Sequence, residues 1–483
     1  MKLFNTMSRQ IEEVQPPAPA KLGLYSCGPT VYDYAHLGHL RKFTMDDLLV
    51  RTLRHQGYQV HFVQNITDVG HLASDADTGE DKMEKGAQKY QTTVWELAKK
   101  FEEHFWYSMQ LMGNLKPDVS PRATEHIEEQ LKLVQELEAK GFTYVIENDG
   151  VYFDTSRLED YGQLARRGDL AQLQEGARVE PVAGKKHPTD FALWKFERPG
   201  ESRAMVWPSP WHERSFPGWH VECSAMSMKY LGEQFDIHTG GIDHISVHHP
   251  NEIAQSEAAT GKKPFVRYWV HHNFLMVEGE KMSKSKNNFF TIDDVMERGF
   301  HPLALRLLFL TAHYRSEMNF TWENLAGVHK SYLRLLETLS QFKRESGRTV
   351  LSEDKLEKID RYRQQFFAEL ANDLNSPAAV AVMWEVVKSN IPGVDKHELL
   401  MDFDQVLGLG FSQADQILAK WGGTAVTAVE LPTEVKQLVA DRESARQEQN
   451  WELADQIRQQ LLGHGFEVKD TPQGAELIKK SNF

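Results

Sequence analysis

The chain contains only two cysteines, Cys27 and Cys223, among 483 residues. Small secreted domains rely on several disulfides, so this scarcity excludes a disulfide framework. A single bridge between the two stays open, but a metal site or a reactive thiol fits a reducing compartment better. The longest apolar runs, such as 303–310, fall far short of the roughly 20 residues that a bilayer span requires. The N-terminus also lacks the pattern of a signal peptide. We therefore expect a cytoplasmic protein without a membrane segment.

Positive charge is also scarce, because 55 Lys and Arg face 69 Asp and Glu, a net charge of −14. Phosphate binding requires clustered Lys and Arg, so a surface that binds nucleic acid all over is disfavoured, while a local basic face is allowed. Hydrophobic residues make up 41% of the chain, enough for a large core, which excludes general disorder. The sequence has no repeat at a fixed period, and its length indicates several domains.

Two common motifs are absent, the GxxxxGK[ST] phosphate-binding loop and the HExxH zinc motif. The first predicted element is a strand at 22–26, and a helix that starts at the HLGH sequence of 36–39 follows it. A second strand is predicted over 58–69, where β-branched and aromatic residues alternate with polar ones. Strands separated by helices indicate a parallel α/β sheet.

The predicted elements change character several times along the chain. From about 116 to 205 a helix and short β segments indicate an inserted α+β module, after which the α/β pattern resumes, and the two halves are expected to close one sheet. Beyond 290 the pattern is mostly helical, and 421–433 is predicted to be a linker. We divide the chain into the first half of an α/β domain (1–115), an inserted connective module (116–205), the second half of the domain (206–290), a helical region (291–345), a helical bundle (346–424) and a C-terminal unit (425–483).

Two short motifs suggest phosphate chemistry. His36 and His39 flank Gly38 at a predicted helix start, where backbone N–H groups and imidazoles can bind a phosphoryl group. Lys281 and Lys284, within KMSKS, can neutralise charge during nucleotidyl transfer. Taken singly, a polar helix start and a solvated loop explain these residues better. The two motifs together, in this order, are far more specific.

A third set of residues suits a metal ion. His248 and Glu252 stand four residues apart on a predicted helix and therefore share a face. With Cys27 and Cys223 they would form a donor set of two sulfurs, one nitrogen and one oxygen, which suits zinc. Each residue alone is better explained as a buried structural side chain. However, the parallel sheet is expected to bring Cys27, Cys223 and His248 to one rim.

These motifs occur in the order CGPTVYDYAHLGH, GWHVECSAM, HHPNEIAQSE and KMSKS, followed by ARQEQNWELADQIRQQL. In this order the chain resembles the cysteinyl-tRNA synthetases, which are class I aminoacyl-tRNA synthetases, from nearly one end to the other. The resemblance implies a Rossmann-like catalytic domain with an inserted α+β module, a helical bundle and a small C-terminal anticodon-binding unit. It also implies a monomer.

The resemblance further implies the reaction and its partners. L-cysteine would be activated with ATP and Mg²⁺ to cysteinyl-adenylate and then transferred to the terminal ribose of tRNA(Cys). One zinc ion would be held by Cys27, Cys223, His248 and Glu252, and would bind the sulfur of the substrate. Zinc prefers thiolate to hydroxyl, which would separate cysteine from serine.

The remaining site residues are carried over position by position from the same resemblance. Trp219 would form a wall of the amino-acid pocket. The residues expected at the nucleotide are His36, His39, Lys281, Lys284, Gly240, Gly241 and Asp243. Arg446, Trp451 and Asp455 would read the anticodon, although a surface helix with one apolar anchor explains them as well.

Two alternatives remain open at this point. One is a zinc-dependent ligase of the mycothiol pathway, which joins cysteine to an amino-sugar and needs no unit that reads tRNA. The C-terminal unit argues against it. The other is a catalytically inactive paralogue that binds tRNA or has a structural role. Such a paralogue would be free to lose His39 or Lys284, and this chain retains both.

Overall fold

The structure, a computed structural model, describes residues 1–16, 20–70, 81–165, 183–282, 288–345, 351–421, 424–425, 433–448, 450–471 and 474–479. Among these residues, no helix is both long enough and apolar enough to cross a bilayer.

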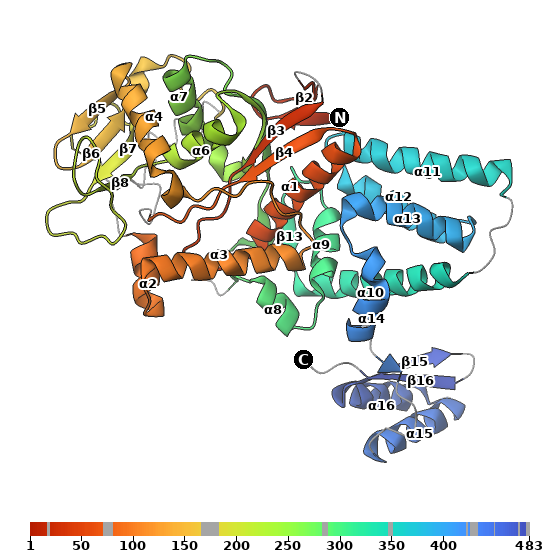
Figure 1. Cartoon of the computed structure of the whole chain (residues 1–483). Coiled ribbons are helices and arrows are strands. Elements are labelled where there is room, and N and C mark those ends of the chain that lie inside the picture. Colours follow the sequence, from red (N-terminus) through yellow and green to blue (C-terminus); the bar gives the residue numbers. More distant parts are fainter. Residues whose placement is uncertain are drawn as a thin grey trace.

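A four-stranded parallel sheet forms the centre of the molecule (Figure 1). Its strands follow the order β10-β9-β3-β4, so β3, which precedes the insertion, pairs with β9, which follows it. The bounds are β3 (Lys21–Ser26), β4 (Gln59–Gln64), β9 (Phe235–Gly241) and β10 (Val266–His272). The prediction that the two halves close one sheet is confirmed.

Helix α1 (Leu37–His55) connects β3 to β4, as expected for a parallel crossover. Strand β4 ends at Gln64, five residues before the predicted end at 69. The chain turns at this point because the Asn65 side chain accepts a hydrogen bond from the backbone N–H of Gly28. Beyond it, Ile66 and Thr67 form only isolated bridges with Arg122 and Thr30.

The inserted module has an antiparallel sheet of its own, in the order β5-β6-β7-β8. Its elements are α4 (Ile127–Ala139), β5 (Thr143–Ile146), β6 (Gly150–Phe153), β7 (Phe191–Phe196) and β8 (Ser215–Pro217). Leu133 and Trp194 of the module share a hydrophobic cluster with Ala225 of α6 (Val221–Leu231) and Ala254 of α7 (His248–Thr260). In Figure 1 the module lies on the opposite side of the central sheet from the helical bundle.

Most of the remaining chain is helical. Helices α2 (Lys82–Tyr90) and α3 (Val94–Leu111) precede the insertion. After it come α8 (Ile292–Glu297), α9 (Pro302–Leu310), α10 (Trp322–Arg344), α11 (Glu353–Ala371), α12 (Ser376–Lys388), α13 (Gly393–Leu407) and α14 (Ala414–Trp421). The pattern did not predict α13, whose N-terminus carries no side-chain cap. Short strands complete this part: β1 (Lys2–Asn5), β2 (Gln10–Glu13), β11 (Leu275–Val277), β12 (Glu280–Lys281) and β13 (Met318–Phe320).

The core continues from the central sheet into the bundle. All of α9 is buried, including Arg306, whose guanidinium bonds to the Leu407 carbonyl of α13 and to Asp47 of α1. A buried arginine is tolerated only when it is paired in this way. The bundle is therefore fixed to the helix that begins at HLGH.

The C-terminal unit lies apart from the other domains in Figure 1. It consists of α15 (Thr433–Gln447) and α16 (Trp451–Gly463) with a sheet of β14 (Thr424–Ala425), β16 (Gly474–Lys479) and β15 (Phe466–Thr471). The linker prediction over 421–433 is wrong at β14, which pairs with β16. Val435, Ile457 and Phe466 belong to a small core of the unit.

Candidate functional site

The four predicted metal ligands come together at the carboxyl rim of the central sheet. Cys27 follows β3, Cys223 lies in the first turn of α6, and α7 provides His248 and Glu252. One donor atom from each lies within 4.8 Å of the other three. The Cys27 sulfur is 3.8 Å from both His248 Nε2 and Glu252 Oε1, which are 2.9 Å from each other. Both cysteines are free thiols, so no bridge joins them.

Local structure explains why Cys27 reaches this rim. The residue after it must be glycine, because a Cβ at Gly28 would lie 1.5 Å from the Asn65 carbonyl oxygen. Glycine therefore lets the segment that follows β3 pass directly against the segment that follows β4. On α7 the spacing of four residues places His248 and Glu252 on one face.

The protonation states agree with a cation site. Burial opposes ionisation of Glu252, yet the neighbouring His238 and His248 bring its pKa down to about 2. A hydrogen bond from Cys27 lowers the pKa of Cys223, whereas burial and the nearby Cys223 raise that of Cys27. Burial opposes protonation of His248, yet its contacts with Cys223 and Glu252 raise its pKa. The cluster therefore provides an ionised carboxylate, and its protons on Cys27 and His248 are the ones that a cation would displace.

The donor set fits a tetrahedral zinc ion. Zinc bond lengths of roughly 2.0–2.3 Å at tetrahedral angles place donor atoms about 3–4 Å apart. The separations of 2.9 and 3.8 Å lie close to that range. Glu252 also has a contact outside the four-residue cluster, because His238 Nε2 lies 2.8 Å from its second oxygen. Such outer contacts orient metal ligands.

Sequence reasoning missed two histidines beside the cluster. His238 in β9 and His249 in α7 form a second possible donor group together with Cys27 and Glu252. His249 lies 3.5 Å from the Cys27 sulfur and 2.7 Å from His271. The density of histidines in 238–249 and 271–272 was the available signal, but periodicity does not say which of them face one another.

The HLGH motif forms the N-terminal cap of α1. His36 is the N-cap, and its Nδ1 accepts hydrogen bonds from the backbone N–H groups of Gly38 and His39. The two imidazoles stack with their centroids 3.7 Å apart. Burial lowers the pKa of His36 to about 4, so it is neutral at pH 7. A neutral imidazole there can donate through Nε2 to an incoming phosphoryl group.

The start of KMSKS lies against this helix terminus. A Cβ at Gly38 would stand 2.8 Å from Met282 Cε, and the backbone N–H of Leu37 donates to the Phe290 carbonyl. Lys281 ends β12, with its ammonium 4.5 Å from the centroid of the Phe274 ring. Lys284 lies outside the described residues. Met282 and Phe290 therefore both lie beside HLGH, although the two motifs are about 245 residues apart in sequence.

The residues expected near adenosine follow β9. Gly240 and Gly241 end this strand, and Asp243, largely exposed, lies in the turn that follows. A Cβ at Gly240 would be only 2.5 Å from the His249 ring, so no larger residue fits there. Burial lowers the pKa of His36, and the negative charge of Asp243 partly opposes this effect.

Trp219 is connected to the predicted metal ligand His248 through the ring of His220. It is 7% exposed and packs with Tyr152 and Ala192 of the inserted module. Its ring centroid is 5.8 Å from that of His220, which in turn is 4.0 Å from that of His248. The inserted module therefore supports one side of the metal cluster.

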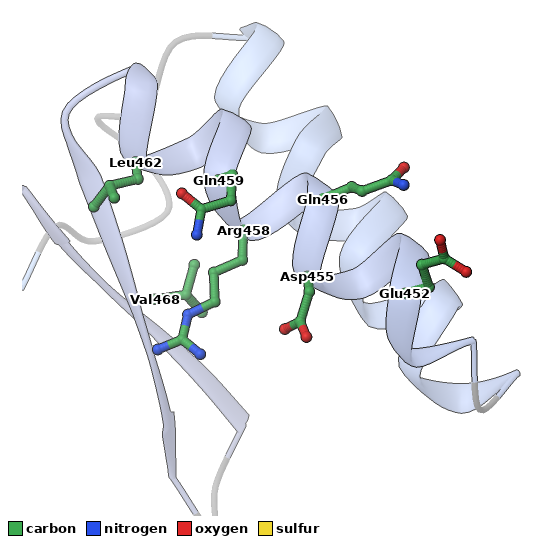
Figure 2. Close-up of a pocket in the computed structure, with 7 residues that line it drawn as sticks. All are labelled: Glu452, Asp455, Gln456, Arg458, Gln459, Leu462 and Val468. Atoms are coloured by element: carbon green, nitrogen blue, oxygen red, sulfur yellow. The ribbon is translucent and has the colours of Figure 1, made fainter.

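The three residues expected to read the anticodon lie on the terminal helices. The Arg446 guanidinium is 5.9 Å from the Trp451 ring centroid, and Trp451 is 59% exposed. Asp455 borders a hollow of about 680 Å³ beside β15. Figure 2 shows that the side chains of Asp455 and Arg458 extend from the same side of α16. An exposed indole beside an arginine and an acid can stack on a base and bond its edge.

Comparison with protein families gives two matches. Residues 13–330 match the family described as tRNA synthetases class I (C) catalytic domain, and residues 428–476 match the cysteinyl-tRNA ligase anticodon binding domain.

Among curated proteins, the chain is similar to "Cysteine--tRNA ligase 1" of Burkholderia lata, at 46% identity over 99% of this chain and 97% of that protein. It is also similar to the "Cysteine--tRNA ligase" of Zymomonas mobilis, at 40% identity over 97% of this chain and 95% of that protein. The "Cysteine--tRNA ligase" of Treponema denticola is 42% identical over 97% of this chain and 98% of that protein.

A solved structure of Mycobacterium tuberculosis methionyl-tRNA synthetase in complex with methionyl-adenylate has a similar fold, with a TM-score of 0.57. The alignment covers 83% of this chain and 93% of that one at 14% identity, a level that speaks for the fold alone.

Proposed function

Because the chain belongs to the class I cysteinyl-tRNA synthetase family, we propose that it is a cysteine–tRNA ligase acting as a cytoplasmic monomer. It activates L-cysteine with ATP to cysteinyl-adenylate, releases pyrophosphate, and transfers the cysteinyl group to the 3′-terminal ribose of tRNA(Cys). The observation that carries this proposal is the cluster of Cys27, Cys223, His248 and Glu252, buried except for the half-buried His248, in which Cys27 lies on the segment that leads from β3 to α1.

We assign the metal site to zinc, held by these four residues. When bound, zinc supplies a Lewis acid that prefers the substrate thiolate to the hydroxyl of serine. Glu252 enters the site ionised, whereas Cys27 and His248, whose pKa values are raised, would release protons when the metal binds. Trp219, packed on Tyr152, limits the space left for the substrate side chain.

The chain contributes positioning and charge rather than a nucleophile. The substrate carboxylate attacks the α-phosphate of ATP, which is accompanied by Mg²⁺. His36 and His39 at the start of α1 donate hydrogen bonds to the phosphates, and Lys281 and Lys284 stabilise the pyrophosphate that leaves. Gly240, Gly241 and Asp243 provide the adenosine side of the site.

The C-terminal unit recognises the tRNA. Trp451 stacks on an anticodon base, while Arg446 and Asp455 bond to base edges. The exposure of Trp451 and the open hollow at Asp455 support this role. Neither a ligase of the mycothiol type nor an inactive paralogue would require both this unit and an intact nucleotide site.

The test is cysteine-dependent ATP–pyrophosphate exchange, followed by charging of tRNA(Cys), with the holoenzyme, the chelated protein and Cys223→Ser. Exchange should require cysteine, fall with zinc content in Cys223→Ser, and return when zinc is restored to the chelated wild type. Exchange with serine should be far weaker. Zinc-independent exchange would contradict the metal assignment. Exchange without tRNA charging would indicate the amino-sugar ligase, and binding of tRNA without exchange would indicate the inactive paralogue.

A further inference from the structure

Helix α7 carries more than two metal ligands on its inner face. His248, Asn251, Glu252 and Gln255 follow one another at intervals of three, one and three residues and therefore form a single stripe. Asn251, Glu252 and Gln255 are each at most 1% exposed. The metal cluster accounts for His248 and Glu252 but leaves the two amides unexplained.

Gln255 holds the backbone of Trp219. Its Nε2 donates to the Trp219 carbonyl over 2.8 Å, and its Oε1 accepts a bond of 2.6 Å from the Ser224 hydroxyl. The Trp219 carbonyl can only accept, so it fixes which end of the amide faces it, and the hydroxyl donates to the other end. On the other side, the N–H of Trp219 donates to the Ala192 carbonyl. Trp219 is therefore held between the helix with the metal ligands and the inserted module.

Asn251 holds the next residue, His220. Its Nδ2 is 3.1 Å from His220 Nδ1, and its Oδ1 accepts a bond from the Tyr161 hydroxyl. His220 has φ of 66°, the left-handed region that side chains other than glycine rarely occupy. Surrounding contacts must maintain such a conformation. The conformation of His220 bears on the metal cluster because His220 is the N-cap of α6, and Cys223 follows it by three residues on that helix.

We propose that Asn251 and Gln255 are positioning residues for amino-acid selection, because their buried hydrogen bonds fix His220 and the Trp219 wall, respectively, relative to the metal ligands. This inference rests on the proposed function. One helical stripe then sets both halves of the pocket, since His248 and Glu252 hold the metal while the amides one turn away hold the wall. Neither amide touches the substrate, and each acts through the residue that it holds.

The test is Gln255→Leu, which keeps the approximate size but leaves the Trp219 carbonyl without its donor. The KM for cysteine in ATP–pyrophosphate exchange should rise about tenfold, because a buried acceptor is left unsatisfied beside the pocket. The kcat and the KM for ATP should stay within about threefold, since a wall contact is made equally in the ground state and the transition state. Zinc content should remain one per chain.

The matched control is Gln130→Leu. Gln130 is equally buried in α4, and its Nε2 also donates over 2.8 Å to a backbone carbonyl, that of Ala123. Its replacement should lower the melting temperature similarly while leaving the KM for cysteine unchanged. If both variants changed the KM alike, or if Gln255→Leu lost zinc and kcat together, the inference would be overturned.

A milder variant covers the case in which Gln255→Leu does not fold. Ser224→Ala removes only the hydroxyl that donates to the Gln255 amide oxygen, and should raise the KM for cysteine about twofold to fivefold with zinc retained. An unchanged KM in this variant would also count against the inference. Failure of the proposed function is distinguishable, because the wild type itself would then show no cysteine-dependent exchange.

Discussion

His238 Nε2 lies 2.8 Å from Glu252 Oε2, and both side chains are completely buried. The contact ties the inner strand β9 to α7, which carries two of the proposed metal ligands. Since Glu252 directs its other oxygen at His248, its two oxygens have separate partners, one inside the cluster and one behind it. The orientation of the carboxylate is therefore fixed before a metal binds.

Replacing His238 by Gln should weaken zinc binding by roughly 10- to 100-fold, the usual effect of losing an outer partner of a metal ligand. Competition with a chromogenic chelator measures this affinity. The control is His104→Gln, because His104 Nε2 also contacts a carboxylate, that of Asp293 at 2.6 Å, and neither residue adjoins a proposed metal ligand. Equal zinc loss in both variants would show that the effect is general destabilisation.

Lys284→Ala should lower the rate of adenylate formation about a hundredfold or more, because the ammonium stabilises charge that develops in the transition state. The KM for cysteine should hardly change. Pyrophosphate exchange at saturating cysteine separates the two effects, and Lys262→Ala, at an exposed ion pair with Glu233, is the control. A collapse in cysteine affinity would mean that the role assigned to Lys284 is wrong.

Trp451→Ala should raise the KM for tRNA by about 5- to 100-fold, as expected from loss of base stacking worth ~1–3 kcal/mol. Stability should stay unchanged because the side chain is 59% exposed. Pyrophosphate exchange without tRNA should also be normal. Trp95, exposed by 49% on α3, provides the matched replacement, which should leave tRNA charging unaffected. Normal charging by Trp451→Ala would exclude an anticodon contact at this residue.

Stability should fall as the pH drops from about 6.5 to 4, partly through His301 at the start of α9. Burial, reinforced by His329 and Lys420, lowers the pKa of His301 to about 4. The unfolded chain takes up this proton near pH 6.5 and the folded chain only near pH 4, so acid favours unfolding across that window. At pH 5 the loss amounts to about 1–2 kcal/mol.

The variant His301→Asn tests this origin. Nδ1 of His301 accepts the Leu303 N–H as a helix cap, and asparagine can cap in the same way without titrating. Thermal unfolding at pH 7 and pH 5 should show a smaller difference for the variant than for the wild type. An identical pH dependence would assign the acid sensitivity to other groups.

The sequence by itself determined the local elements and the chemistry of the motifs. The 3.6-residue pattern after HLGH predicts α1, and the spacing of His248 and Glu252 places them on one face of α7. These features are decided within a few residues. The order of the motifs over the whole chain likewise identified the family before any distance was known.

Tertiary structure alone decided which distant groups meet. Three contacts join segments whose separation follows no helical or strand period. They are the contact of His238 with Glu252, the hydrogen bond from Gln255 to the Trp219 carbonyl, and the pairing of Thr424–Ala425 with β16. Such contacts depend on how the central sheet closes around the insertion and on how side chains pack between layers. Local periodicity carries no information on either, so these relationships appear only in the folded chain.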